Sequence, residues 1–368
     1  MTQENLAFNQ NAIYEFQRGS MFLQGQRGLI DSVHRVHEDV FSTYKLLKRQ
    51  DWDELEFELV NARADFARYP KHGEMMKNNI GWQWSGDSAA ANSLVPMVAP
   101  FQPCSDAWLW FVKQGENENL HALSYSECVK ISVPDGMREI LRIHRDQDTM
   151  RRVNYITEVF DHVMKVGAKM QLGMVDWRSE EASDALMLML CAIFCLERQQ
   201  FMPSFANTAA LFFQSMFVPI GQTVQKIAVD EWGTHIPQIR RIIQHELTIP
   251  ERRASMKRIE PLVRNLIEEV AHNEVTWNTR QFQIGGEQVG MTEQMGADYE
   301  YYAATDVANE LGIVTNVPVI TRNPLPMMDN FLNLNREQKA VMEGKGGNYQ
   351  TVAVKKSGTL TSLNIDDL

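Results

Sequence analysis

The chain has 368 residues, a formal net charge of −11 at pH 7, 44% hydrophobic residues and 23% charged residues. This composition is ordinary for a globular protein, and the length is enough to bury a large core without disulfides. The negative charge argues against a nucleic-acid-binding protein, because affinity for phosphate backbones depends on a basic surface. A nucleotide substrate held by a partner protein remains compatible with this charge.

The cysteines and the first residues indicate a reducing compartment. The cysteines show no CxxC spacing, and the sequence does not start with the basic and then apolar pattern of a secretory leader. We therefore expect a cytoplasmic protein with free thiols. The four cysteines are Cys104, Cys128, Cys191 and Cys195.

The longest apolar run covers residues 185–196, between Asp184 and Glu197. It is much shorter than the ~20 residues that a membrane span needs. We interpret it as a helix buried in a protein core, and we expect no association with a membrane.

Helical periodicity extends from about residue 30 to residue 310, and clear strand patterns with hairpin dipeptides are hard to find. The sequence therefore predicts an all-α protein built around a helical bundle. Long helical segments are expected at 148–172, 180–205, 209–248 and 251–276, with Pro203, Pro219 and Pro237 kinking or restarting helices.

The chain divides into three expected regions. Residues 1–30 form an N-terminal segment that we expect to be partly flexible, and residues 31–335 form the helical domain. Residues 336–368 are polar, rich in Lys, Gly, Ser and Thr, and without periodicity. That composition predicts a flexible C-terminal tail.

Four predicted helical segments each carry a carboxylate in an apolar or weakly polar context, and two of them add a histidine. Residues three or four apart share one helix face, so each Glu–His pair can point to one place. Carboxylates with two imidazoles suit iron or manganese, and bridging carboxylates let two cations lie close together. The residues are Asp87, Glu118, His121, Glu197, Glu231 and His235.

Each of these features alone has a simpler interpretation. A single Glu-x-x-His is more often a solvated pair on a helix surface, and Asp87 alone can be a helix cap. Glu197 differs, because it directly follows the apolar run, where an unpaired carboxylate is costly. The combination on separate helices predicts a dinuclear metal site.

With these residues in view, the sequence resembles the small, radical-generating subunit of class I ribonucleotide reductases. Residues 118–125 (Glu-Asn-Leu-His-Ala-Leu-Ser-Tyr) look like the family signature, in which a tyrosine follows the Glu-x-x-His pair by four residues. Asp87 lies 31 residues before Glu118, and Glu231 lies 34 residues after Glu197, as in the family layout. Further matches are residues 196–205, similar to its third-ligand helix, and residues 323–331, similar to its Asn-Pro-x-Pro segment.

The resemblance implies a ferritin-like bundle with two metal positions bridged by carboxylates. The implied cofactor is dinuclear iron, although manganese or a mixed manganese–iron pair fits the same ligands. Asp87, Glu118 and His121 would bind one ion, and Glu197, Glu231 and His235 would bind the other.

The resemblance also assigns the radical. Tyr125 would be oxidised to a stable radical, and it lies one further turn along the helix from His121. Phe201, Phe205 and Ile227 match the apolar sleeve that shields such a radical, although by residue type alone they are simply core.

Two more residues take expected roles from the family. Asp230 resembles the carboxylate that orients a ligating histidine, here His121. Trp52 is the candidate tryptophan that relays electrons to and from the surface, although a packing or surface role explains it equally well.

The spacing departs from the family pattern at the second Glu–His pair. One residue more separates Glu231 from His235 than a Glu-x-x-His motif allows. Three and four steps along a helix fall about 60° and 40° to either side of the starting direction, so both spacings keep the pair on one face. We predict that the helix departs from regular α geometry at this point. A π-bulge is one distortion that could absorb the extra residue, and it is common at functional sites.

The resemblance gives the tail a partner. Tyr349 lies 19 residues before Leu368 and resembles the tyrosine that passes the radical to the large catalytic subunit. Residues 363–368 mix apolar and acidic side chains, as expected of a docking peptide that folds on binding. A homodimer, dioxygen as the oxidant and docking of the tail to the large subunit are all implied by the family.

Two alternatives stay open. One is another di-iron carboxylate enzyme, such as a desaturase, a hydrocarbon monooxygenase or a ferritin-like oxidase; those generally have Glu where this chain has Asp87. The other is a non-catalytic helical scaffold with solvated Glu–His pairs. Asp87, Tyr125 and Tyr349 favour the reductase subunit over the first alternative, and metal analysis of the purified protein would separate the second.

Overall fold

The computed structural model describes residues 7–10, 19–31 and 33–333. Within these ranges every regular element is helical, and β pairing is limited to an isolated bridge between Gln288 and Met291. The all-α prediction is therefore confirmed.

Most of the described chain lies in ten helices of twelve or more residues. They are α1 (Glu38–Arg49), α3 (Pro70–Val98), α4 (Ser105–Glu127), α6 (Gln147–Gln171), α7 (Glu180–Phe194), α8 (Met202–Phe213), α9 (Val218–Asp230), α10 (Ile236–Leu247), α11 (Pro250–Gly285) and α12 (Glu293–Leu311).

Shorter elements connect or extend these helices. Three of them are π-helical turns that continue a preceding α-helix: η4 (Cys128–Ser132), η5 (Cys195–Phe201) and η6 (Glu231–His235). The others are the 3-10 turns η2 (Leu59–Ala62) and η3 (Ala99–Phe101) and the short helices α2 (Arg63–Arg68), α5 (Gly136–Ile143) and α13 (Pro326–Phe331).

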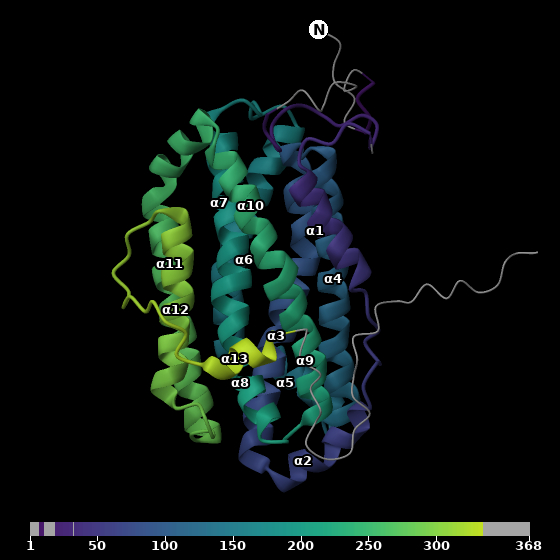
Figure 1. Ribbon diagram of the computed structural model, residues 1–368, viewed down its shortest axis with the longest axis vertical. Helices are drawn as coiled ribbons and strands as arrows, with labels where there is room; N and C mark the ends of the chain where they lie inside the picture. Colours follow the sequence, from purple (N-terminus) through teal and green to yellow (C-terminus); the bar gives the residue numbers. More distant parts are fainter. Residues whose placement is uncertain (1–6, 11–18, 32, 334–368) are drawn as a thin grey trace, which may run out of the picture.

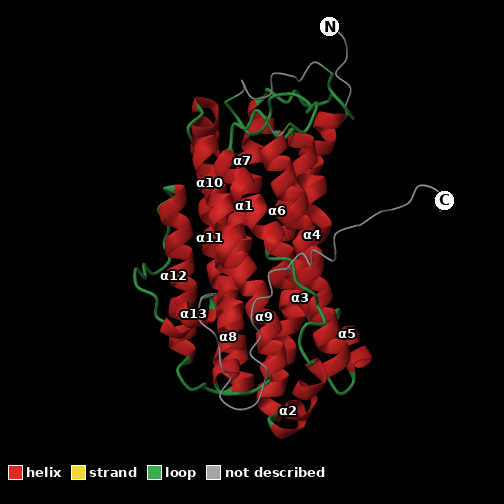
Figure 2. Ribbon diagram, turned by 45° about the vertical axis from the view of Figure 1, so that its right-hand side comes forward, coloured by secondary structure: helices red, strands yellow, loops and turns green. Residues whose placement is uncertain are grey.

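The long helices run along the long axis of an elongated bundle (Figure 1). Helix α3 packs against α4, α6 and α11, and α7 packs against α6, α10 and α11. Two columns, α7–η5–α8 and α9–η6–α10, extend through most of its length, and Figure 2 shows the same arrangement after a 45° turn. Helix α2 closes one end of the bundle, and residues 19–31 lie at the other.

Helix α7 forms the centre of the core. Ser179 caps its N-terminus by accepting a hydrogen bond from the Ala182 amide, and Glu180 and Glu181 favour the positive end of the helix dipole. The segment Glu180–Phe213 is apolar and long enough to cross a membrane, yet its most apolar window is completely buried inside the bundle. The interpretation of residues 185–196 as a buried core helix is therefore confirmed.

The prolines mark where helices restart. The expected helical segment 209–248 is interrupted, because the chain turns after α8 through Phe217 in the left-handed region (φ 51°). Pro219 lies in the first turn of α9, which η6 joins to α10. Pro203 and Pro237 each lie two residues after a π-helical turn. A proline has no N–H to donate to the carbonyl four residues earlier, so it suits the point where the hydrogen-bond register changes.

Part of the expected N-terminal segment belongs to the packed structure. Met21, Phe22 and Leu23 are buried against the bundle, and the Leu23 amide donates to the carbonyl of Phe101 at 2.9 Å. The domain boundary at residue 31 stays a prediction. The structure attaches residues 21–23 to the core before that boundary.

Candidate metal centre

Four elements bring the predicted site residues to one place in the middle of the bundle. Helix α3 contributes one carboxylate, α4 a Glu–His pair, η5 one carboxylate and η6 the second Glu–His pair. All six side chains are at most 1% exposed. They are Asp87, Glu118, His121, Glu197, Glu231 and His235.

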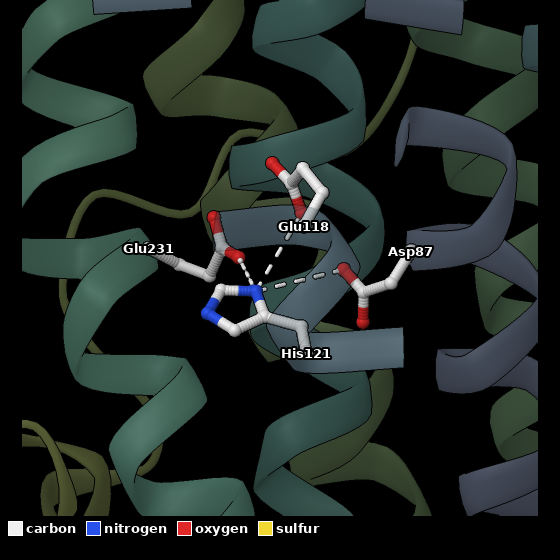
Figure 3. A group of neighbouring side chains, drawn as sticks. All are labelled: Asp87, Glu118, His121 and Glu231. Carbon is white, nitrogen blue, oxygen red and sulfur yellow. Dashed lines mark ion pairs between the residues drawn. The ribbon is translucent and has the colours of Figure 1, made fainter. Parts of the chain in front are cut away.

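The first group surrounds His121, whose Nδ1 faces three carboxylates (Figure 3). This nitrogen lies 3.1 Å from Glu231 Oε1, 3.5 Å from Glu118 Oε2 and 3.9 Å from Asp87 Oδ1. The four side chains come from three different helices, so this convergence is a tertiary contact and not a surface Glu–His pair.

The second group surrounds His235. Its Nδ1 lies 2.6 Å from Glu231 Oε2, 3.3 Å from Glu118 Oε1 and 3.8 Å from Glu197 Oε1. Glu118 and Glu231 therefore belong to both groups, and each offers one oxygen to either side. This is the arrangement that two bridging carboxylates require.

The polar atoms at the centre fit a pair of cations. Many of them are buried and have no hydrogen-bond partner among the described residues: both carboxylate oxygens of Asp87 and of Glu231, Oε2 of Glu118 and of Glu197, and Nδ1 of both histidines. Leaving so many buried acceptors unsatisfied is costly in a folded protein. Binding of hard divalent ions would satisfy these acceptors, because carboxylate oxygens and imidazole nitrogens are ligands that such ions prefer.

The charges in the cluster are strongly coupled. Burial raises the pKa of Asp87 and of Glu197 well above the usual range, and for Glu197 the charges of Glu231 and Glu118 add to the shift. Burial opposes the charged forms of His121 and His235 as well, but the carboxylates around them raise their pKa well above that of a free imidazole. In the absence of cations the cluster therefore holds several protons.

The predicted departure from regular α geometry at the second Glu–His pair is confirmed, and it is a π-helical turn, η6, over residues 231–235. The wider turn absorbs the extra residue and keeps Glu231 and His235 facing the same point. The second π-helical turn, η5, carries Glu197 and was not predicted from the sequence. Its signal is Pro203, which lies two residues past the turn just as Pro237 does after η6.

On the outer side of His121, hydrogen bonds lead toward the protein surface. His121 Nε2 lies 3.3 Å from Asp230 Oδ2, and the Trp52 indole nitrogen donates to the same oxygen at 2.8 Å. The structure therefore places Trp52, Asp230 and His121 in one chain. A carboxylate in this position fixes the tautomer of an imidazole and increases its basicity.

On the outer side of His235 an amide takes the corresponding place. His235 Nε2 lies 2.9 Å from Asn117 Oδ1, which accepts only from a protonated nitrogen and so leaves Nδ1 for a cation. The Asn117 amide also donates to Asp230 Oδ2 at 3.3 Å, so the two histidines share one network. Asn117 was missed in the sequence, although it precedes His121 by one helical turn.

Gln114 positions Glu197 and also donates to Glu118 Oε1 at 3.3 Å. The side-chain amide of Gln114 donates to Glu197 Oε1 at 2.7 Å, and its carbonyl accepts from the Trp110 indole at 3.1 Å. The amide is thus held in one orientation, and Glu197 Oε2 is left for the cluster. Gln114 precedes Glu118 by one turn, which is the signal that could have identified it.

Tyr125 lies on α4 one turn beyond His121 and is completely buried. Its hydroxyl has no hydrogen-bond partner among the described residues. Burial, together with the charge of Asp87, raises the pKa of the phenol well above its usual value. Phe201, Phe205 and Ile227, the expected sleeve, are also completely buried. Tyr349 lies outside the described residues.

The fold and the site together define a class of protein, a helical bundle whose buried carboxylates and histidines fit a dinuclear metal centre. A sequence profile of the family "Ribonucleotide reductase, small chain" matches residues 32–324. The chain therefore belongs to the ribonucleotide reductase small-chain family.

Solved structures support the fold. The ribonucleotide reductase R2 subunit from Clostridium botulinum is 17% identical with a TM-score of 0.75, and the match covers 90% of this chain and 98% of that one. Dimanganese(II)-NrdF from Streptococcus sanguinis is 16% identical with a TM-score of 0.66, covering 83% and 99%.

Other similar structures carry a different name. An R2-like ligand-binding oxidase with a Mn/Fe cofactor is 14% identical with a TM-score of 0.59, and the match covers 79% of this chain and 96% of that one. A comparison with curated proteins found no match. At these identities the likeness confirms the ferritin-like fold that was predicted and does not choose between the two activities.

Proposed function

We propose that this chain is the small subunit of a class I ribonucleotide reductase, which generates a radical on Tyr125 and passes it to a large subunit that reduces ribonucleotides. Asp87, Glu118 and His121 would hold one metal ion, and Glu197, Glu231 and His235 the other. When bound, the ion pair would supply a one-electron oxidant made with dioxygen. We propose iron for this pair, and manganese or a mixed pair fits the same donors.

The surroundings of Tyr125 suit a stored oxidising equivalent. Its raised pKa means that the phenol keeps its proton until an electron is removed, so electron and proton leave together. Its burial among apolar side chains excludes water and external reductants from the ring. The protein thereby supplies shielding and position, and the metals supply the oxidation.

The hydrogen-bonded chain from Trp52 through Asp230 to His121 is the observation that favours this function most. Trp52 is half-buried, whereas His121 is fully buried at the cluster. An enzyme that oxidises its own ligand needs no such connection to the outer part of the protein. A subunit that exports an oxidising equivalent does need one.

The remaining steps of the proposal concern the tail and the assembly. We propose that residues 336–368 dock on the large subunit and that Tyr349 carries the radical across the interface. We also propose a cytoplasmic homodimer. A peptide of this composition gains order only on a partner's surface, so docking there is consistent with its sequence.

A ligand-binding oxidase is the second candidate, because similar structures include such proteins. The two functions differ in what they require. The reductase subunit needs a large subunit and Tyr125, whereas an oxidase turns over alone and consumes dioxygen without nucleotide reduction.

The test combines the chain, loaded with ferrous or manganous ions under air, with the large subunit from the same organism. We expect reduction of a ribonucleotide that depends on both chains and is lost in Tyr125→Phe. Metal analysis of the Tyr125→Phe chain is the control, because normal metal content shows that the loss of activity comes from the missing phenol. Dioxygen consumption without nucleotide reduction, unchanged by Tyr125→Phe, would favour the oxidase.

A further inference from the structure

Three tryptophans lie next to the metal centre, and their indole N–H groups have different partners. Trp52 donates to the carboxylate of Asp230 at 2.8 Å. Trp110 packs edge-on against His235 and donates to the neutral amide of Gln114. The third, Trp82, is the one for which no role has been described above.

Trp82 lies close to the ligand-bearing turn of α3. It is 1% exposed, and its ring packs edge-on against Phe201 with centroids 5.4 Å apart. A methyl group at Gly86, the residue before Asp87, would touch both of these rings. Trp82 therefore lies on the helix that carries Asp87 and packs against the π-helical turn that carries Glu197.

The indole N–H of Trp82 offers no route for a proton. Its Nε1 is buried and has no hydrogen-bond partner among the described residues. Removal of an electron from an indole makes its N–H strongly acidic, so a nearby base makes the oxidation easier. Trp52 has such a base in Asp230, and Trp82 has none.

A guanidinium lies against the ring of Trp82. The guanidinium carbon of Arg152 is 3.9 Å from the ring centroid of Trp82 and 4.3 Å from that of Trp277. Arg152 is only 3% exposed, and an arginine stays charged in a protein. A buried cation against an aromatic face stabilises the neutral ring and opposes the positive charge that oxidation creates on it.

Arg152 is fixed in this place by other buried groups. Its Nε donates to Glu274 Oε1 at 2.9 Å, and its Nη2 donates to the other oxygen of the same carboxylate. Gln200 donates to Glu274 as well. The remaining nitrogen, Nη1, has no hydrogen-bond partner in the described part of the chain. Besides its ion pair with Glu274, the guanidinium therefore contacts the rings of Trp82 and Trp277.

We infer that Arg152 raises the oxidation potential of Trp82 and thereby directs electron transfer from tryptophan to Trp52. Loss of an electron from Trp82 to the oxidised centre would reduce that centre by one electron and leave a cationic indole beside a cation. The same loss at Trp52 passes the indole proton to Asp230 and leaves a neutral ring. The role in directing the radical depends on the proposed function, whereas the effect on the potential of Trp82 does not.

The test is done first on the metal-free chain, so it is independent of radical generation. Azide radicals made by radiolysis in aerated buffer take one electron each from indoles, and dioxygen then adds to the oxidised rings. Peptide mass spectrometry measures the oxygenated product at each tryptophan. The test variant is Arg152→Met with Glu274→Gln, which removes the cation together with the carboxylate that forms an ion pair with it.

We expect the Trp82 product to rise roughly tenfold in the double variant, because a desolvated cation–π contact is worth about that factor. The Trp110 product is the internal reference, since Trp110 is equally buried and lies beside His235 and Gln114. Arg152→Lys, which keeps a cation beside the ring, should leave Trp82 protected. Arg280→Met removes a guanidinium 5.1 Å from the Trp277 ring and should also leave Trp82 protected.

The same variants are then loaded with ferrous ions and exposed to air. We expect oxygenated Trp82 and a smaller yield of the Tyr125 radical in the double variant only. Equal Trp82 oxidation in wild type, Arg152→Lys and the double variant of the metal-free chain would overturn the inference. If the double variant loses its helical circular dichroism, Arg152→Gln with Glu274→Gln replaces it under the same criterion. A wild-type chain that forms no Tyr125 radical, with Trp82 still protected by Arg152, would contradict the proposed function and leave this inference standing.

Discussion

The two halves of the metal centre are built from similar ligands but are supported in different ways. The half around His121 comes from two regular α-helices, and behind the imidazole stands the carboxylate of Asp230. The half around His235 comes from two π-helical turns, and behind that imidazole stands the neutral amide of Asn117. Glu118 and Glu231 contribute to both halves.

The two outer partners, a carboxylate behind His121 and an amide behind His235, suggest different roles for the two histidines. A carboxylate behind an imidazole makes the imidazole a stronger donor. Asp230 bonds directly to both His121 and Trp52, whereas His235 reaches Asp230 only through the neutral amide of Asn117. An amide behind an imidazole fixes its tautomer without adding charge. On the proposed function, each half would hold one cation, and the His121 half would have the direct hydrogen-bonded connection to Trp52.

The largest expected effect comes from removing a carboxylate that both halves use. Glu231→Ala should lose both ions, because each group of donors loses an oxygen and Glu118 alone then bridges. Glu197→Ala, which removes a donor of the His235 half only, is the matched comparison and should retain the ion of the His121 half. Metal analysis after gel filtration measures both. Equal loss in the two variants would show that the halves are not separate.

The second effect distinguishes the carboxylate behind His121 from the amide behind His235. Asp230→Asn should keep the metal pair but lower nucleotide reduction roughly 100-fold, since it removes the base between Trp52 and His121. Asn117→Ala should instead lower metal affinity roughly tenfold, with the residual activity proportional to metal content. Activity per bound metal pair is the quantity to compare. If Asp230→Asn retained full activity per metal pair, the oxidising equivalent would have to leave the site by another route.

The third effect concerns protons at the cluster. The pKa of Asp87 and of Glu197 is raised by burial, and that of His121 is raised by the carboxylates around it, so these groups keep their protons to higher pH than they would in water. Each proton that a cation displaces makes its affinity rise about tenfold per pH unit. Competition with a chelator as pH is increased should therefore show tightening affinity. An affinity independent of pH would mean that the donors are already ionised.

The smallest effect is expected at the extra residue of η6. Gly233 is exposed and has open space where a side chain would start, so Gly233→Ala should leave metal content unchanged. Deletion of Gly233 should return the turn to α-helical spacing and keep both ions within a few-fold of wild-type affinity, because Glu-x-x-His also shares one face. Should the deletion lose an ion as completely as His235→Ala, the wide turn is itself required.

Much of the site follows from helix geometry, and the rest depends on packing. The pair Glu118 and His121 lies on a regular helix, where spacing alone places both side chains on one face. The extra residue before His235 signals a π-bulge for the same reason. Neither argument predicts η5, because Glu197 has no partner at helical spacing in its own segment.

The supporting residues were harder to find because they depend on contacts between distant segments. Asn117 and Gln114 lie one turn before ligands on a predicted helix, yet polar residues at such positions are common. Only the fold shows that Asn117 reaches His235 and that Gln114 reaches Glu197. Arg152 and Trp82 lie on different helices, and nothing in their local sequence places one against the other.

The most direct test is metal analysis combined with electron paramagnetic resonance of the chain after loading with ferrous ions and exposure to air. We expect two ions per chain and a tyrosyl signal that disappears in Tyr125→Phe while both ions remain. A chain that binds no more than one ion, or a tyrosyl signal that persists in Tyr125→Phe, would contradict a dinuclear centre that oxidises Tyr125.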